Sequence, residues 1–109
     1  TARRSGISLR YKEGLYFSSI SGKANDYAVN STKKGPRGRK WRCMFVCNVA
    51  AGKAFCTTEV GLPSDKCPPP GYDSVVGEVS PTGLNYDELV VYKEEAALPS
   101  YLIVYSYLK

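Results

Sequence analysis

The sequence of 109 residues contains no histidine, and its four cysteines lack the paired Cys-x-x-Cys spacing that surrounds a tetrahedral zinc ion. It also lacks any stretch close to the roughly 18 apolar residues that a membrane-spanning helix needs. We therefore expect neither a metal site nor a membrane span. Cys43 and Cys47 lie in an apolar stretch, where thiols often act as small hydrophobic side chains. An even cysteine count would permit disulfides in a secreted protein, but we favour reduced cysteines and an intracellular location, nuclear or cytoplasmic.

Composition indicates an ordinary globular chain. Hydrophobic residues make up 43% of the sequence and charged residues 23%. A chain of this length can bury a modest core but is too short for two independent ones. We therefore expect residues 1–109 to form a single domain.

Positive charge is concentrated in the first part of the chain. Residues 1–42 carry eleven Lys or Arg against two acids, whereas residues 43–109 carry four against eight. Six of these cations fall within ten residues: Lys33, Lys34, Arg37, Arg39, Lys40 and Arg42. Such a cluster attracts an anionic partner, nucleic acid or a dinucleotide, and Trp41 would be available to stack on a base. The alternative interpretation is a solvated basic loop that binds nothing.

The β-prone segments are short and separated by turn-rich loops. This pattern favours an α+β domain with a curved or split mixed β-sheet and one or two short helices. Residues 14–19 are predicted to form a strand, and Ser21 to cap a short helix that continues to Ala28. Glycine, proline and clustered like charges predict an irregular, exposed loop over residues 30–40.

Later segments are predicted to be mostly strands. Residues 41–49 and 54–60 are β-prone and fit either two strands or one bent strand. A short strand is expected over residues 73–79. The strongest β signals are at 88–92 and 100–108, and we expect both to lie centrally in a sheet. Large side chains alternate onto both sides of the last segment, so we expect both of its faces to be covered.

Glu88 stands at the start of an apolar strand, where alternation directs it to the same side as Val90 and Tyr92. A half-buried carboxylate at this place could stabilise a developing positive charge or accept a proton. Otherwise Glu88 is simply the exposed first residue of its strand, in one acidic turn with Asp87.

Tyr16 and Tyr27 lie on the first predicted strand and on the helix that follows it. A tight turn could bring their rings to two sides of a slot that suits a planar aromatic ligand. Aromatic residues in such positions also commonly pack in the core, and spacing alone leaves both interpretations open.

Five segments, in this order, resemble the catalytic domain of the poly(ADP-ribose) polymerase type of ADP-ribosyltransferase. They are Gly14–Ser19 (GLYFSS), Gly22–Tyr27 (GKANDY), Pro70–Gly77 (PGYDSVVG), Tyr86–Tyr92 (YDELVVY) and Pro99–Tyr105 (PSYLIVY). The resemblance extends over nearly the whole chain from Gly14 onward and concerns the C-terminal part of that domain. It implies an ADP-ribosyltransferase-like fold. It also implies an enzyme that cleaves nicotinamide from NAD and transfers ADP-ribose to an acceptor protein or nucleic acid.

The resemblance assigns catalytic roles to two residues. Glu88 is similar in position to the family's catalytic glutamate, which would hold the ribose 2′-hydroxyl and offset positive charge at the anomeric carbon. Tyr16 is similar in position to the tyrosine of the family's His-Tyr-Glu triad, which lines the nicotinamide-ribose site.

The resemblance also implies which residues bind NAD. Tyr27 is similar in position to the tyrosine that stacks on the nicotinamide ring, and Gly14 and Lys23 belong to the same region. Ala24 stands where many members have a serine that binds the nicotinamide amide, so one hydrogen bond worth about 0.5–1.5 kcal/mol would be lost.

The family's third catalytic residue, a histidine in a His-Gly-Thr or similar motif, has no counterpart in this sequence. We hypothesise that the chain is an N-terminally incomplete part of a longer ADP-ribosyltransferase, or that a partner chain supplies the histidine. The alternative is a natural variant that has diverged.

Three functions follow from these observations. The first is an NAD-dependent ADP-ribosyltransferase, with NAD as substrate. The second is a catalytically impaired module on the same fold that binds NAD, ADP-ribose or another partner. The third is weak contact with nucleic acid through the basic residues Lys33–Arg42.

Overall fold

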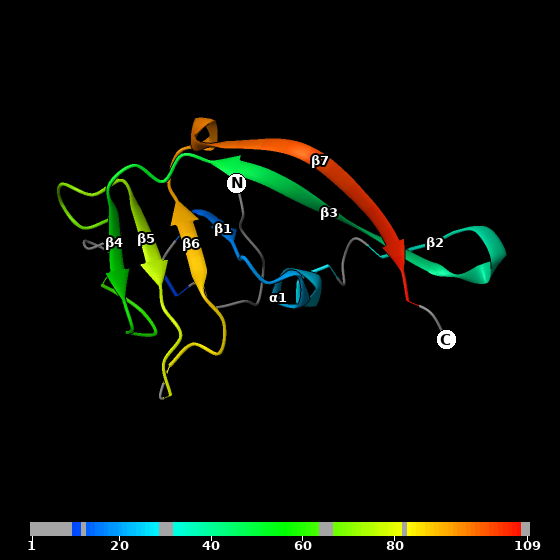
Figure 1. Ribbon diagram of the computed structural model, residues 1–109, viewed down its shortest axis with the longest axis horizontal. Coiled ribbons are helices and arrows are strands. Elements are labelled where there is room, and N and C mark those ends of the chain that lie inside the picture. Colours follow the sequence, from blue (N-terminus) through cyan, green and yellow to red (C-terminus); the bar gives the residue numbers. More distant parts are fainter. Residues whose placement is uncertain (1–9, 12, 29–31, 64–66, 82, 108–109) are drawn as a thin grey trace.

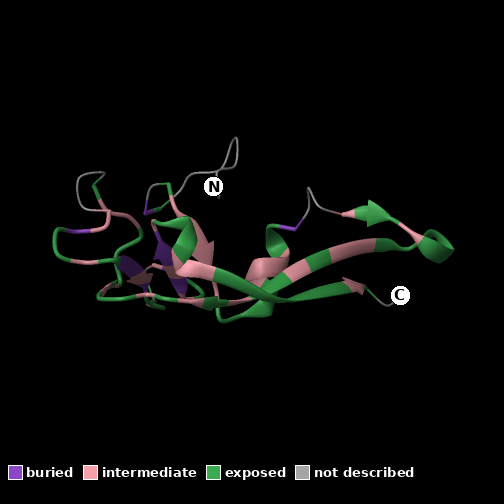
Figure 2. Cartoon of the chain, turned by 90° about the horizontal axis from the view of Figure 1, so that it is seen from above, coloured by how far each residue is buried: buried purple, intermediate pink, exposed green. Residues whose placement is uncertain are grey.

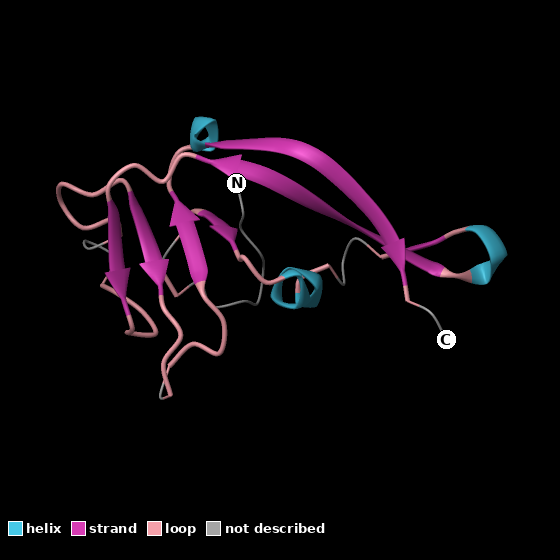
Figure 3. Ribbon diagram, in the orientation of Figure 1, coloured by secondary structure: helices cyan, strands magenta, loops and turns pink. Residues whose placement is uncertain are grey.

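The chain folds into two β-sheets joined by loops, with little helix (Figure 3). The structure, a computed structural model, describes residues 10–11, 13–28, 32–63, 67–81 and 83–107. Its strands are β1 (Leu15–Phe17), β2 (Lys33–Lys34), β3 (Lys40–Val49), β4 (Ala54–Thr57), β5 (Ser74–Gly77), β6 (Glu88–Val91) and β7 (Ala97–Ser106). Its helical elements are α1 (Ser21–Asp26) and the 3-10 turns η2 (Pro36–Gly38) and η4 (Glu94–Ala96). The prediction of an α+β class with a split, mixed sheet and short helices is confirmed.

The first sheet contains four short strands in the order β1-β6-β5-β4 (Figure 1). Strand β6 pairs antiparallel with both β1 and β5, and β4 runs parallel to β5. The central position predicted for residues 88–92 is therefore confirmed, although β6 ends at Val91.

The hydrophobic core lies against β5 and β6 of this sheet. Its fully buried members are Tyr11, Val75 and Val90. The two valines are direct partners in the pairing of β5 with β6, so their side chains meet on the same face. Partly buried side chains complete the cluster: Tyr16, Leu62, Cys67 and Tyr92. Burying a valine side chain stabilises a fold by about 1.5–3 kcal/mol, so this small cluster is a main source of stability for the first sheet.

The second sheet has the order β2-β3-β7, and β3 and β7 form a long antiparallel ribbon that extends away from the first sheet (Figure 1). Its surface is mostly exposed or only partly covered (Figure 2). The prediction that residues 100–108 lie centrally with both faces covered is wrong for the described part, which ends at residue 107. Strand β7 is an edge strand, and Tyr101 and Val104, on opposite faces, are 71% and 60% exposed. Alternation of large side chains indicates a strand, but burial depends on what packs over it.

The two β-prone stretches in the middle of the chain are two strands, β3 and β4, which belong to different sheets. In the turn between them Gly52 has a φ of 60°, in the left-handed region. A Cβ at this position would lie 2.5 Å from Asp73 Oδ2, which accepts a hydrogen bond from the Lys53 backbone N–H at 2.9 Å. This turn therefore requires glycine, because of the positive φ and because a Cβ would overlap the Asp73 side chain. The turn separates β3 from β4.

Residues 30–40, predicted to be an irregular loop, form an ordered hairpin where the structure describes them; residues 30 and 31 lie outside the described ranges. Strand β2 pairs with the start of β3, and η2 makes the turn between them. The prediction of exposure is confirmed, but the prediction of irregular structure is wrong. The long strand β3 offers a partner edge that outweighs the local preference of glycine and like charges for loops.

Candidate functional site

Tyr16 is positioned by β1, which lies along β6. In this antiparallel pair Tyr16 is directly opposite Val90. The chain enters β1 through Gly14, where a Cβ would lie 2.7 Å from Val90 Cγ1 and 2.9 Å from the carbonyl oxygen of Val91. Gly14, which the resemblance places in the NAD-binding region, is therefore needed for close packing of the two strands.

Glu88 is the first residue of β6 and points to the same face of the sheet as Tyr16. Residues two apart on a strand share a face, and so do residues opposite one another in an antiparallel pair. Glu88 and Val90 are two apart on β6 and share a face. Val90 is opposite Tyr16, so Tyr16 lies on that face too. Because Glu88 is only 6% exposed, the interpretation of it as an exposed strand end is wrong. Its partner on β5 is Gly77, so no side chain stands directly beside it there.

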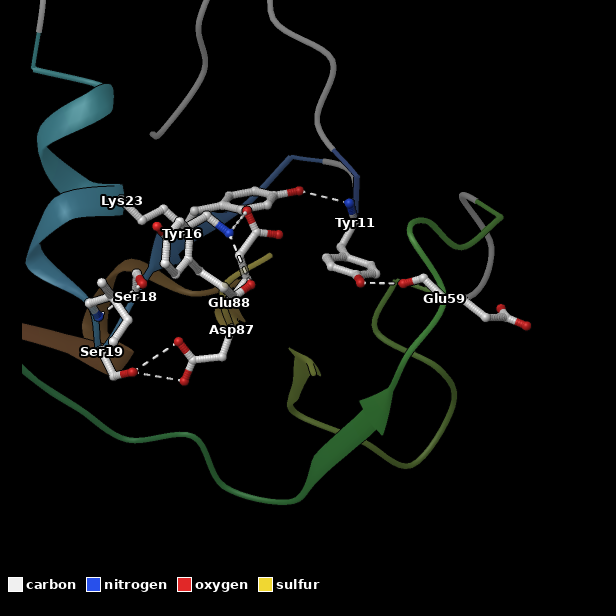
Figure 4. A network of polar contacts seen from close by, with 10 residues as sticks. Tyr11, Tyr16, Ser18, Ser19, Lys23, Glu59, Asp87 and Glu88 are labelled. Carbon is white, nitrogen blue, oxygen red and sulfur yellow. Dashed lines mark hydrogen bonds and ion pairs between the residues drawn. The ribbon is translucent and has the colours of Figure 1, made fainter. Parts of the chain in front are cut away.

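Lys23, from α1, forms an ion pair with Glu88 (Figure 4). Its Nζ lies 2.9 Å from Glu88 Oε1 and also donates to the backbone carbonyl of Tyr86 at 3.4 Å. The two side chains are only 13% and 7% exposed. A buried carboxylate requires such a partner, because an unpaired charge away from water is costly. The helix thus supplies the ion-pair partner of the buried Glu88 carboxylate.

The second carboxylate oxygen of Glu88, Oε2, is also buried. Within the described part of the chain it has no hydrogen-bond partner. Buried polar side-chain atoms nearly always have a partner, so each exception calls for an explanation. This oxygen can accept a hydrogen bond from a ligand hydroxyl, and it is the feature of this region that points most directly to a ligand.

The hydroxyl oxygen of Tyr16 accepts a hydrogen bond from the backbone N–H of Tyr11 at 2.9 Å. Burial, and then the negative charge of Glu88, raise the pKa of Tyr16 to about 12, although the Tyr11 hydrogen bond acts in the opposite direction. Tyr16 therefore keeps its proton at neutral pH. A neutral phenol is an amphipathic wall for a binding site, with an apolar ring and a polar tip.

Tyr11 organises this region, although nothing in the sequence marked it (Figure 4). Its side chain is fully buried, and its hydroxyl donates to the Glu59 carbonyl at 2.5 Å. Its own carbonyl accepts from the hydroxyl of Tyr92 at 2.8 Å. Tyr11 precedes β1 in a turn, without strand or helix periodicity, and its partners lie 48 and 81 positions away. Only the folded chain brings these groups together.

The helix α1 begins differently from the prediction. Ser21 is its first residue rather than its cap, since Ile20 holds the cap position without a side-chain hydrogen bond. The chain turns into the helix one residue earlier because the Ser18 hydroxyl accepts from the Ile20 backbone N–H at 3.1 Å. The helix ends at Asp26 rather than continuing to Ala28.

Tyr27 follows the last residue of α1 and is 41% exposed, so it is not part of the core. It lies four residues after Lys23, a spacing that puts both on about the same side of the helix. Tyr16, in contrast, packs against the core cluster. Ala24 is half-buried and brings no side chain that could form a hydrogen bond. That Tyr16 and Tyr27 frame one slot stays a prediction.

Polar contacts attach both ends of α1 to its surroundings. Before the helix, the Ser19 hydroxyl lies 2.9 Å from both carboxylate oxygens of Asp87, the residue next to Glu88. Near its end, Asn25 Oδ1 accepts from Tyr105 and Arg42, which belong to the ribbon. The helix that carries Lys23 therefore connects the two sheets.

Several other kinds of site find no support in the described ranges. No group of three His, Cys, Asp or Glu side chains there is close enough to hold a metal ion. No helix in the same ranges has the length and apolar character needed to cross a bilayer. The four cysteines form no disulfide with one another. A scan of the chain against models of known protein families gives no match.

Proposed function

We propose that the chain carries the tyrosine and glutamate part of an NAD-dependent ADP-ribosyltransferase site, on an ADP-ribosyltransferase-like fold of the poly(ADP-ribose) polymerase type. The observation that carries the proposal is Glu88 Oε2, a buried carboxylate oxygen without a hydrogen-bond partner among the described residues. Glu88 lies on the face shared with Tyr16 and is paired with Lys23 from α1, the helix that Tyr27 follows directly.

In the proposed reaction, Glu88 Oε2 accepts a hydrogen bond from the ribose 2′-hydroxyl of NAD. The bond between C1′ and the nicotinamide nitrogen breaks, and its electron pair leaves with nicotinamide. Positive charge develops on the ribose ring, and the Glu88 carboxylate stabilises it electrostatically. A nucleophilic atom of the acceptor then bonds to C1′ and loses its proton to solvent water.

The binding part of the proposal rests on the tyrosines. Tyr16 would line the nicotinamide-ribose site, and the exposed ring of Tyr27 would stack on nicotinamide. Lys23 would hold Glu88 in place by its ion pair. The 109 residues contain no histidine, so a group from outside them would have to orient the ribose, or turnover would be low.

A second function on the same site is a module that binds NAD or ADP-ribose without catalysis. Ala24 favours it, because it offers no hydroxyl to the nicotinamide amide. The Lys23 ion pair favours it too, because a cation 2.9 Å from Glu88 weakens the negative field available to a developing positive charge.

The deciding experiment incubates the chain with radiolabelled NAD and measures nicotinamide release, labelled protein and NAD binding by calorimetry. The matched pair of variants is Glu88→Gln and Glu78→Gln, since Glu78 is exposed and directly follows β5. Removing one electrostatic stabiliser lowers a reaction rate by a factor on the order of 10²–10³. Glu88→Gln should therefore release nicotinamide that much more slowly, whereas Glu78→Gln should release it at the wild-type rate. Saturable binding without release would select the binding module. Absence of NAD binding in the wild type would show that both functions are wrong.

A further inference from the structure

The strongest feature that the candidate site leaves unexplained is the charge at the far end of the ribbon. Strand β2, turn η2 and the start of β3 form a hairpin that projects from the second sheet, away from the first sheet (Figure 1). We call residues 33–40 the basic hairpin. Its five cations are exposed: Lys33, Lys34, Arg37, Arg39 and Lys40. The segment contains no acidic residue and no large apolar one.

The positive charge of the basic hairpin is not neutralised within the described part of the chain. The ion pair found there joins Lys23 to Glu88, at the candidate site. Of the hairpin cations, Arg39 donates to a neutral hydroxyl, that of Ser106, at 3.4 Å. Uncompensated exposed cations are free to exchange their counterions for phosphates.

The pairing register makes this arrangement costly for folding. Lys34 and Lys40 are direct cross-strand partners, so two like charges stand side by side on one face of the hairpin. Like charges in directly opposed positions destabilise a β-hairpin. A polyanion bound to the hairpin would remove this repulsion. A hairpin with a purely structural role would not require two lysines in directly opposed positions.

The turn holds a further cation at the tip. Arg37 has a φ of 61° and Gly38 a φ of 69°, both in the left-handed region, which is disfavoured for a residue with a Cβ. Hydrogen bonds from Gly35 N to Arg39 O at 2.9 Å and from Arg39 N to Pro36 O at 3.3 Å close the loop. Arg37 is therefore presented at the end of a defined turn.

The hairpin carries charge on both of its faces. Lys34 and Lys40 share one face, and alternation puts Lys33 on the other, with its partner Trp41. A flat anionic membrane would meet only one face, and the hairpin has no apolar side chain to insert. The major groove of duplex DNA, about 12 Å wide, admits a two-stranded ribbon and offers phosphates along both of its walls.

Two residues suggested by the sequence do not belong to this surface. Arg42 faces inward, where its guanidinium donates to Thr32 Oγ1 at 2.8 Å and to Asn25 Oδ1 at 3.1 Å. The Trp41 ring is half-buried against Gly35, where a Cβ would overlap it, and its Nε1 is buried. That Trp41 stacks on a base stays a prediction.

We propose that the basic hairpin binds duplex nucleic acid by entering the major groove and contacting phosphates on both sides, without reading the base sequence. This inference is independent of the proposed NAD chemistry. Contact with phosphates alone carries no sequence information, and each neutralised phosphate contributes about −0.9 to the slope of log K against log salt.

The test measures fluorescence anisotropy of the full chain with two 20-base-pair DNA duplexes of unrelated sequence, between 50 and 300 mM NaCl. With five cations engaged, the expected salt slope is about −4 to −5 for both duplexes. The variant Lys34→Gln/Lys40→Gln should reduce the slope by about 2 and weaken binding at 50 mM salt by at least about tenfold. Lys34→Arg/Lys40→Arg keeps the charge and should bind like the wild type.

The matched control is Lys53→Gln/Lys93→Gln, which removes the same charge from exposed positions elsewhere. It should change the affinity for DNA less than about twofold, because exposed charges that lie more than a Debye length, about 10 Å, from the bound DNA are screened. Equal weakening by both double variants would overturn the proposal, as would a wild type that binds neither duplex. Single-stranded DNA bound as tightly as duplex would contradict groove entry. Binding to phosphatidylserine vesicles but not to duplex would assign the hairpin to membranes instead.

Discussion

The two sheets contain similar residues but use them in different ways. In the first sheet the strands have three or four residues, and the central ones are buried. In the ribbon β3 and β7 have ten residues each, and most of these are exposed. Strand length and β propensity therefore do not indicate where the core lies. The candidate site belongs to the buried sheet, and the uncompensated charge belongs to the exposed ribbon.

Three matched substitutions sharpen this comparison, each made once in the first-sheet region and once in the ribbon. The pairs are two lysines, two valines and two tyrosines. The expected difference is greatest for the lysines, because removing a cation from a buried ion pair leaves an unpaired charge behind.

Lys23→Met should destabilise the fold by about 3 kcal/mol, since it leaves Glu88 buried without a counter-charge. Lys40→Met should have almost no effect or be slightly stabilising, because Lys40 is exposed and stands opposite Lys34. Urea unfolding followed by circular dichroism measures both. Lys23→Met/Glu88→Gln, which removes both charges, should recover much of the loss. Similar losses for the two single lysine variants would contradict the role given to the ion pair.

The valine pair compares packing directly. Val90→Ala opens a cavity in the core, and a cost of about 2 kcal/mol is expected because Val90 is fully buried. Val104→Ala should change stability by less than about 0.5 kcal/mol, because Val104 is 60% exposed. The same urea experiment serves here. A loss at Val104 as large as at Val90 would mean that the ribbon is covered in solution, by a second copy or another chain.

Much of the fold could be predicted from local patterns. Alternation along residues 88–92 predicted the central strand and the shared face of Glu88 and Val90, because pleating alone decides which side chains share a face. The same reasoning wrongly predicted that both faces of β7 are covered, since a strand pattern says nothing about what packs over the strand. It failed also for residues 30–40, where pairing with β3 overrides a loop-prone composition.

The candidate site was only partly predictable. Tyr16 and Glu88 come together because their strands pair, which the sequence suggested through their positions on predicted strands. The Lys23 ion pair depends on how α1 lies over the end of β6, and no local pattern specifies that placement. Tyr11 was missed for the same reason, since its three polar contacts exist only after the chain has folded.

The tyrosine pair should give the smallest difference in the free energy of unfolding, and part of that difference appears only at alkaline pH. Burial and the charge of Glu88 raise the pKa of Tyr16 from 10.0 to about 12 in the folded state. The stabilisation that favours the neutral phenol is fully present below pH 10 and is lost as pH rises from 10 through 12, because the unfolded chain releases the proton first. The pKa of Tyr11 and that of Tyr92 are also raised, chiefly by burial, and act in the same direction.

Tyr16→Phe should remove part of this alkaline loss, and Tyr101→Phe on the ribbon should not. The Tyr16 contribution should be about 1 kcal/mol between pH 9 and pH 12, after allowance for screening by solvent around a half-buried group. Tyr16→Phe should also lower stability at pH 7 by about 1 kcal/mol, because the backbone N–H of Tyr11 loses its acceptor. Urea midpoints at pH 7, 9, 10, 11 and 12 measure both effects. If the two phenylalanine variants have the same profile, the Tyr16 hydroxyl is as open to solvent as that of Tyr101, and the buried site around Glu88 is not closed on that side.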